Sequence, residues 1–340
     1  MAHLKPGDEA PDDAGGRDRA QLLLLAGFVL AAIFVAFAFL LNAVIFAENL
    51  ATRGEGSRTT HAVTTADDVA AGTEGVIVYA NEHNTTDNST LEAELKSGIA
   101  DVERLAGTQQ LADGGVLRVE YDSHRSGTWI NQSYRERNFT DDSYTSDWEL
   151  FSGADGARAF RIDVTDPDQL QDLSGPTPIR NFTVVAHDAA SPKTWEMRVY
   201  HDDADVVSDV TGSAYVAEVT DGDGDTGYCS LDDSLGPSSF WINVSAGTFA
   251  GEECRALRFG EGLSTIEKVE YNNGDNINGT YRLMAAKGKG AISPGSYNDT
   301  GREPPVRTTA IYNATVHVTY DSGDLYYETD RTAEPGRDDE

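Results

Sequence analysis

The sequence contains few basic residues, and this scarcity excludes one large class of partners. Lysine and arginine together number 26 against 57 aspartates and glutamates, which gives a formal net charge of −31. A surface that binds nucleic acid needs clustered positive charge to neutralise phosphates. We therefore expect no nucleic acid partner.

Lysine is the rarest charged residue, with six copies against 20 arginines. An acidic excess spread along the whole chain, combined with so little lysine, resembles the composition of proteins from salt-loving archaea. In molar salt the Debye length falls to about 3 Å, so repulsion among carboxylates is largely screened. The alternative is an acidic, solvated surface on a protein without this adaptation.

Motifs of the common enzyme classes are also missing. No Gly-x-Ser-x-Gly elbow, phosphate loop or dinucleotide fingerprint occurs. The seven histidines form no metal-ligand or nucleophile motif, and His201-Asp202-Asp203 resembles a loop after a strand. We predict that the protein is not an enzyme and has no cofactor. An extracellular enzyme is the third reading, because residues far apart in sequence can meet in space.

One long apolar run lies near the N-terminus. The 26 residues of Leu22–Ala47 include no charged side chain. As a helix they would extend about 39 Å, more than the hydrocarbon core of about 30 Å, whereas a cleaved signal has an apolar core of only about 7–15 residues. We predict a transmembrane helix over 21–47, in contact with membrane lipid, after a cytoplasmic leader over 1–20.

The much longer part of the chain follows this run, and it contains no second run of membrane length. We therefore expect a single-pass protein of the cell membrane, with the N-terminus in the cytoplasm and the C-terminal part outside. Nine Asn-x-Ser/Thr sequons support this direction and predict N-glycosylation, although Thr-rich strands also produce the pattern. The sequon residues are Asn84, Asn88, Asn131, Asn138, Asn181, Asn243, Asn278, Asn298 and Asn313.

Only two cysteines occur, Cys229 and Cys254, and both belong to the outer part. An external compartment favours a disulfide between them. A metal pair or two free thiols are the alternatives, but no histidine or cysteine cluster surrounds them to complete a metal site.

The period of the apolar residues divides the outer part into a helical and a β-rich region. Apolar residues recur at steps of three and four over Ser89–Leu111, where Ser89 and Glu92 have the spacing of a capping box and Gly114-Gly115 supplies a stop. A further helix is expected over 66–80, although Gly72 and Gly75 lower the helix propensity there.

From Val116 onward, short β-rich runs alternate with turn residues. The predicted fold class is α+β: a single N-terminal transmembrane helix, a short helical stem over 48–114, and an antiparallel β-rich extracellular domain over 115–331, followed by a flexible tail over 332–340.

The run DGDGDTG places carboxylates at alternate positions, with Asp221, Asp223 and Asp225 as the candidates for a calcium site. Thr226 stands where a calcium loop of the helix–loop–helix kind has glycine. In so acidic a chain, a solvated turn is the competing and more common interpretation.

The stretch RDRAQLLLLAGFVLAAIFVAFAFLLNAVIFAENLATR resembles the N-terminus of haloarchaeal type IV pilin-like proteins. In that class a charged leader ends in a basic and a small residue, here Arg19 and Ala20, before a long apolar helix. The resemblance implies cleavage between Ala20 and Gln21 and packing against other pilin-like subunits through the helix. Leu25 replaces the acidic residue that many pilins carry near the start of the mature helix.

The sequence thus predicts a membrane-anchored extracellular glycoprotein, a minor pilin or pseudopilin-like subunit of a surface appendage or secretion-type assembly. The alternative is an uncleaved, signal-anchored module of the cell envelope that serves binding or adhesion.

Overall fold

The computed structural model of the chain describes Phe34, Val207, Tyr297, Asn298 and the ranges 59–83, 87–112, 114–173, 180–203, 212–233, 238–292, 304–323 and 325–335. Apart from Phe34, the predicted leader over 1–20, the transmembrane helix over 21–47 and the Ala20–Gln21 border lie outside the described residues, as does the end of the predicted tail. Among the helices that are described, none has the length and apolar character of a membrane crossing.

Two long helices precede the strands. The first covers residues 59–83 and runs without a break through Gly72 and Gly75, so the helix expected over 66–80 is confirmed. The second, α2 (Asn88–Ala112), confirms the other predicted helix. Its cap differs from the prediction, because Asp87 rather than Ser89 accepts a hydrogen bond from the Thr90 amide, at 2.8 Å.

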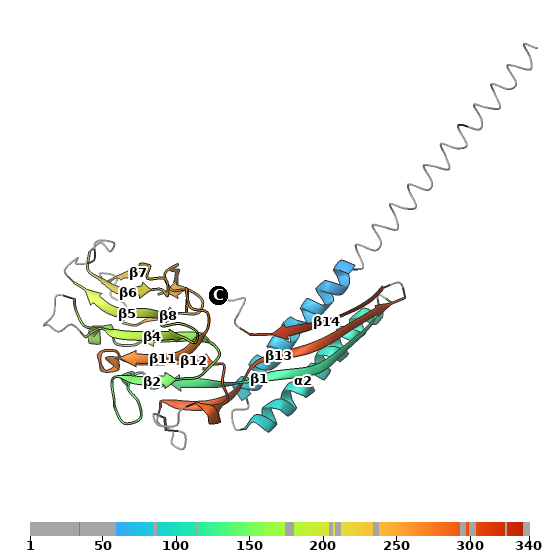
Figure 1. The fold of residues 1–340 in the computed structure, drawn as a ribbon, viewed down its shortest axis with the longest axis horizontal. Coiled ribbons are helices and arrows are strands. Elements are labelled where there is room, and N and C mark those ends of the chain that lie inside the picture. Colours follow the sequence, from blue (N-terminus) through green and yellow to red (C-terminus); the bar gives the residue numbers. More distant parts are fainter. Residues whose placement is uncertain are drawn as a thin grey trace, which may run out of the picture. The chain divides into compact units, whose positions relative to one another are not determined.

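The rest of the described chain is built from strands joined by turns and short 3₁₀ segments (Figure 1). The strands are β1 (Val116–Gln132), β2 (Trp148–Phe151), β3 (Ala157–Val164), β4 (Phe182–Asp188), β5 (Thr194–Asp202), β6 (Ala214–Thr220), β7 (Thr226–Asp232), β8 (Phe240–Asn243), β9 (Thr248–Phe249), β10 (Glu252–Glu253), β11 (Ile266–Asn272), β12 (Gly279–Ala285), β13 (Val306–Ser322) and β14 (Leu325–Ala333). The 3₁₀ segments are η1 (Pro167–Gln169), η3 (Gly274–Asn276) and η4 (Lys289–Ala291).

These strands form two antiparallel sheets, which confirms the α+β class with an antiparallel β-rich region. One sheet has the order β10-β9-β8-β3-β12-β1-β13-β14 and the other the order β2-β11-β4-β5-β6-β7. Inward-facing apolar side chains from both sheets pack into one large core. It includes Phe160 and Leu283 from the first sheet and Trp195 and Val269 from the second. The arrangement is that of a β-sandwich.

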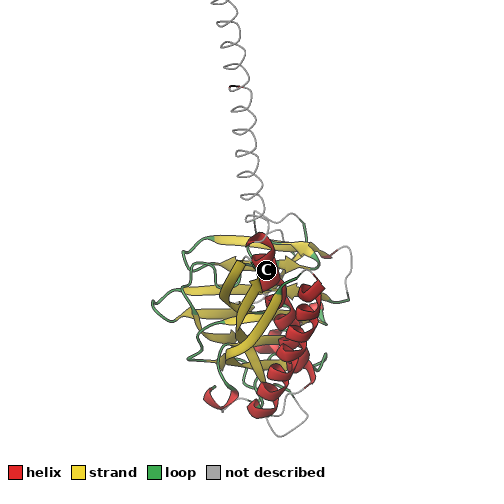
Figure 2. Ribbon diagram, turned by 90° about the vertical axis from the view of Figure 1, so that its right-hand side faces the viewer, coloured by secondary structure: helices red, strands yellow, loops and turns green. Residues whose placement is uncertain are grey.

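The long strands β1 and β13, each of 17 residues, belong to two cores at once. The part of β1 from Val116 to Arg125, together with the segment of β13 that pairs with it, lies under the helices. The part from Ser126 to Asn131, with its partner segment of β13, continues into the sandwich. A second core joins the helices to this sheet through residues such as Leu95, Val119 and Val316. Figure 2 shows the two long helices on one side of the strands. The helical stem and the β-rich region are therefore connected by a continuous sheet.

Candidate functional site

The outward face of the eight-stranded sheet carries three arginines close together because β3 contains a bulge. Arg161 pairs with Arg282 of β12, but the register shifts before Arg158 pairs with Met284. Ala159, inside the bulge, has a φ of 52°. In a regular strand, Arg158 and Arg161 would point to opposite faces because their separation is odd. The extra residue of the bulge places both on the same face.

A cross-strand row runs over this face from β8 to β1. Asn243 pairs with Arg161, Arg161 with Arg282, and Arg282 with Asn131. Tryptophans stand in the adjacent rows on the same face, because Trp241 pairs with Asp163 and Trp129 pairs with Met284. We call the six residues Asn131, Arg161, Arg282, Asn243, Trp129 and Trp241 the arginine face.

The guanidinium groups of Arg161 and Arg282 are exposed, and each lies over an indole ring. The distance from the guanidinium carbon to the ring centroid is 4.9 Å for Arg161 over Trp241 and 4.8 Å for Arg282 over Trp129. Among the described residues, neither arginine has a hydrogen-bond or ion-pair partner, although Asp163 lines the same hollow. Like charges directly opposite on neighbouring strands repel each other. Stacking on tryptophan, worth about 0.5–1 kcal/mol at exposed sites, offsets part of that repulsion.

Arg158 has a different role. Its side chain is buried, its guanidinium lies 4.3 Å above the Tyr312 ring, and it donates a hydrogen bond to the Tyr312 carbonyl. A terminal nitrogen also lies 3.7 Å from the Glu334 carboxylate. Arg158 therefore joins β3 to β13 and to the chain beyond β14.

Two adjoining hollows, of about 600 and about 400 Å³, cover this part of the sheet and share Asn131, Ala159 and Arg282. The smaller hollow is bounded on one side by Asn81 and Glu82 of the first helix. A concave surface with two unpaired guanidinium groups suits an anion, because arginine binds carboxylate, sulfate or phosphate oxygens through two parallel hydrogen bonds.

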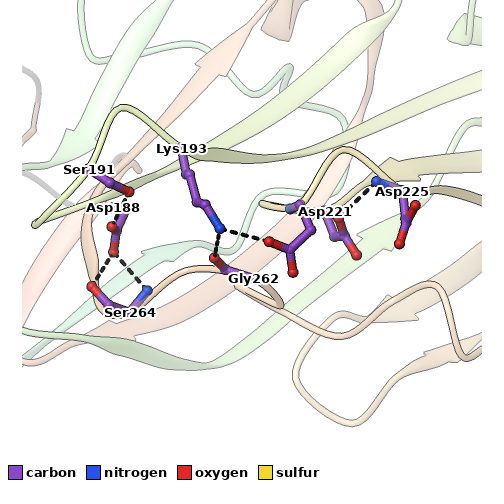
Figure 3. Close-up of polar contacts among 8 residues, drawn as sticks. Asp188, Ser191, Lys193, Asp221, Asp225, Gly262 and Ser264 are labelled. Carbon is purple, nitrogen blue, oxygen red and sulfur yellow. Dashed lines mark hydrogen bonds and ion pairs between the residues drawn. The ribbon is translucent and has the colours of Figure 1, made fainter.

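The calcium candidate Asp221-Asp223-Asp225 forms the tight turn between β6 and β7. An oxygen of Asp221 accepts hydrogen bonds from the backbone amides of Asp223 and Asp225, at 2.8 and 3.0 Å. The Asp223 carboxylate binds Lys193, 2.7 Å away, and Figure 3 shows the same ammonium group reaching Gly262. No group of three or more metal-ligating side chains occurs within the described ranges. The run is a self-capped turn in this structure.

Asp188, at the end of β4, ties two turns together beside that loop (Figure 3). Its carboxylate accepts hydrogen bonds from the hydroxyls of Ser191 and Ser264 and from the Thr265 amide. These bonds stabilise the charged form, so the pKa of Asp188 lies well below its usual range. The contact is structural and fixes the β4–β5 turn against the loop before β11.

Cys229 and Cys254 form the disulfide expected from the sequence, with 5.9 Å between their Cα atoms. Cys229 lies on β7, the edge strand of the six-stranded sheet, and Cys254 directly follows β10, at the edge of the other sheet. The bond therefore closes one side of the sandwich.

The sequon asparagines differ in how their side chains are engaged. Asn138 donates from Nδ2 to the carbonyls of Asp275 and Ile277, at 2.7 and 3.4 Å. Asn243 accepts a hydrogen bond from the Ala246 amide through Oδ1, and the side chain of Asn131 has no hydrogen-bond partner among the described residues. Asn84 lies outside the described residues. The others fall at the start of α2 (Asn88), before β4 and β12 (Asn181 and Asn278), before β13 (Asn298) and on β13 (Asn313).

His201 has partners that its sequence neighbours do not suggest. Its Nδ1 contacts the Asp172 carboxylate, and its Nε2 lies 2.9 Å from Asp233 and 3.2 Å from the Ser213 hydroxyl. The contacts follow the order of an Asp-His-Ser triad, but the Ser213 hydroxyl donates to Asp233. Burial lowers the pKa of His201, whereas hydrogen bonds to Asp233 and Asp172 raise it, and the net shift is upward. Because both ring nitrogens of His201 face carboxylates, and the raised pKa favours the protonated form, the side chain links the two acidic groups as a clamp.

Sequence reasoning missed both clusters. Alternation along β3 and β12 was sufficient to place Arg161 and Arg282 outward, but the strand register that makes them neighbours is not visible in the sequence. His201 and Asp233 stand 32 residues apart and meet only because β5, β6 and β7 form consecutive hairpins.

Comparison with known proteins identifies one similarity. Residues 16–142 match a family model described as a family of unknown function (DUF7261). No curated protein and no solved structure shows a significant match to the chain.

Proposed function

We propose that the protein is a membrane-anchored extracellular glycoprotein, a minor pilin or pseudopilin-like subunit of a surface appendage or secretion-type assembly. The supporting observation is the packing of residues 66–80 and α2 on β1 and β13, the same strands that continue into the sandwich. A subunit that assembles through an N-terminal helix needs its helical part fixed rigidly to its outer part. The continuous sheet supplies that connection.

The sequence border at Ala20 and Gln21 provides the test. Mass spectrometry of the mature protein from its native cells is expected to find Gln21 as the N-terminal residue. An Ala20→Trp variant should retain its leader, because the bulky side chain disrupts the small position before the cut. The matched control is Ala10→Trp, which lies within the leader and should be processed normally. An intact leader on the natural protein would contradict the pilin-like proposal.

The arginine face favours a second candidate, a non-polymerising binding module of the cell envelope that is held by an uncleaved signal anchor. Two exposed arginines that have no ion-pair partner among the described residues, in a chain of net charge −31, suggest a role in recognition. Surface filaments and membranes can be separated and probed for the protein. Recovery from the membrane fraction alone supports this candidate, and recovery from filaments supports the first.

A further inference from the structure

We propose that Asn131 carries an N-linked glycan and that Arg282 and Arg161 bind an anionic sugar of that glycan. The inference rests on the extracellular placement of the sandwich in the proposed function. It deepens the glycosylation expected at Asn131 from its sequon by naming a ligand for the arginine face, a sugar that carries a carboxylate or a sulfate ester.

The position of Asn131 supports attachment at this residue. Its side chain is half-buried at the rim of the hollow, and its amide nitrogen donates no hydrogen bond to any described residue. The third sequon residue, Ser133, is exposed directly after the end of β1. Asn138 is a useful contrast, because its amide nitrogen already binds two backbone carbonyls.

Attachment requires an activated donor and an external transferase. It forms a bond from Nδ2 of Asn131 to the anomeric carbon of a glycosyl phosphate donor. The phosphate leaves with the bonding electron pair, and the amide nitrogen loses one proton. No side chain of this protein has to take part in that transfer.

The arginines lie where the attached chain would pass. Arg282 is the direct cross-strand partner of Asn131, and Arg161 is the next residue in the same row. Neighbouring strands are about 4.8 Å apart, so both guanidinium groups are within reach of the first sugars. A neutral glycan would leave the part of the repulsion between the arginines that stacking on tryptophan does not offset, whereas a carboxylate or sulfate would bind both guanidinium groups.

Covalent attachment favours the protein's own sugar over a free polyanion. A covalently attached glycan is held near the arginines at an effective concentration in the millimolar range or above, and needs no encounter step. The occupant is therefore the protein's own glycan.

The test combines glycopeptide analysis with a cycle of variants of the full-length protein from its native cells. The peptide that contains Asn131 is expected to carry a glycan with an anionic sugar. Ser133→Ala removes the sequon and keeps Asn131, whereas Ser133→Thr preserves the sequon. Each Ser133 variant is combined with the double variant Arg161→Gln/Arg282→Gln. As a control, each is also combined with Arg118→Gln, which replaces an exposed arginine of β1 whose cross-strand partner is Thr319.

We expect Ser133→Ala to lower the melting temperature by about 2 °C relative to Ser133→Thr, the shift expected from one modest ion pair. The same difference should persist with Arg118→Gln and disappear with the double arginine variant. A bare Asn131, a neutral glycan, or a difference that is equal in all arginine backgrounds overturns the proposal. A retained leader would contradict only the pilin-like function, so the two failures are distinguishable.

Discussion

The side-chain amide of Asn81 makes the two hydrogen bonds to the backbone of Ile311 that a neighbouring strand would otherwise make. Its Nδ2 donates to the Ile311 carbonyl at 2.9 Å, and its Oδ1 accepts from the Ile311 amide at 2.8 Å. On that side, β14 pairs with β13 only from Ala314 onward, so the backbone of Ile311 has no strand partner there. The first helix thus completes the hydrogen bonding of β13 at the point where the pairing between β13 and β14 stops.

Replacing Asn81 with alanine should destabilise the protein by about 2–4 kcal/mol. The substitution leaves a buried N–H and a buried C=O without partners, and each costs about 1–3 kcal/mol. Denaturant unfolding measures the change. Gln109→Ala, at an exposed position of α2, is the control and should stay within about 0.5 kcal/mol. Equal stabilities of the two variants would contradict this account of Asn81.

Two glycines in the helices should respond to alanine in opposite directions. Gly75 lies in the first helix, and a methyl group added there would meet open space, so Gly75→Ala should stabilise by up to about 1 kcal/mol through helix propensity. At Gly98 of α2, a Cβ would lie 2.3 Å from a methyl of Val76. Gly98→Ala should therefore push the helices apart and destabilise the protein. Thermal unfolding of both variants tests the contrast, and a stabilising Gly98→Ala would show that the helices do not pack closely there.

Removing the disulfide should weaken the sandwich. The Cys229→Ala/Cys254→Ala variant is expected to lose about 3–4 kcal/mol, as the chain-entropy model gives for a loop of this length. Thiol labelling of the unfolded natural protein should find no free thiol until a reductant is added. Reductant should lower the melting temperature of the natural protein and leave that of the variant unchanged.

The contacts of His201 with Asp172 and Asp233 should make the free energy of unfolding fall at both high and low pH. The pKa of His201 is raised in the folded protein, so its contribution is complete below about pH 6.5 and is lost as pH rises through the folded value. Hydrogen bonds from Ser213 and His201 lower the pKa of Asp233, so its contribution is present above about pH 4 and is lost as pH falls. The clamp is therefore strongest between these limits.

A His201→Gln variant should lose stability within that window and show a flatter profile above it. His83→Gln, at an exposed position of the first helix, is the control. Melting temperatures recorded from pH 4 to pH 9 check the shape. Parallel profiles for His201→Gln and the natural protein would show that the two carboxylates do not hold the imidazolium.

The helices and strands were largely predictable because their side chains repeat with the period of each element. Apolar positions such as Leu91, Leu95 and Ile99 mark the buried side of α2, and all three are buried. The helix cap was less predictable, because Asp87 and Ser89 are both suitable residues two positions apart and only the backbone geometry selects Asp87.

The arginine face could not be predicted, because it depends on two facts of register. The pairing of β3 with β12 sets Arg161 opposite Arg282, and the pairing of β12 with β1 sets Arg282 opposite Asn131. Neither leaves a pattern in a single strand, since pairing involves residues more than 100 positions apart.

The sequence by itself determined the acidic charge and the helical and β-rich regions, and it favoured the pairing of the only two cysteines that the structure shows. Each depends on composition or on local repetition, which a chain carries without reference to its fold. The tertiary structure alone decided that β1 and β13 serve two cores, that Asn81 completes the sheet, and that two arginines and two sequons share one row. These relationships join distant segments, and only the packing of the whole chain brings them together.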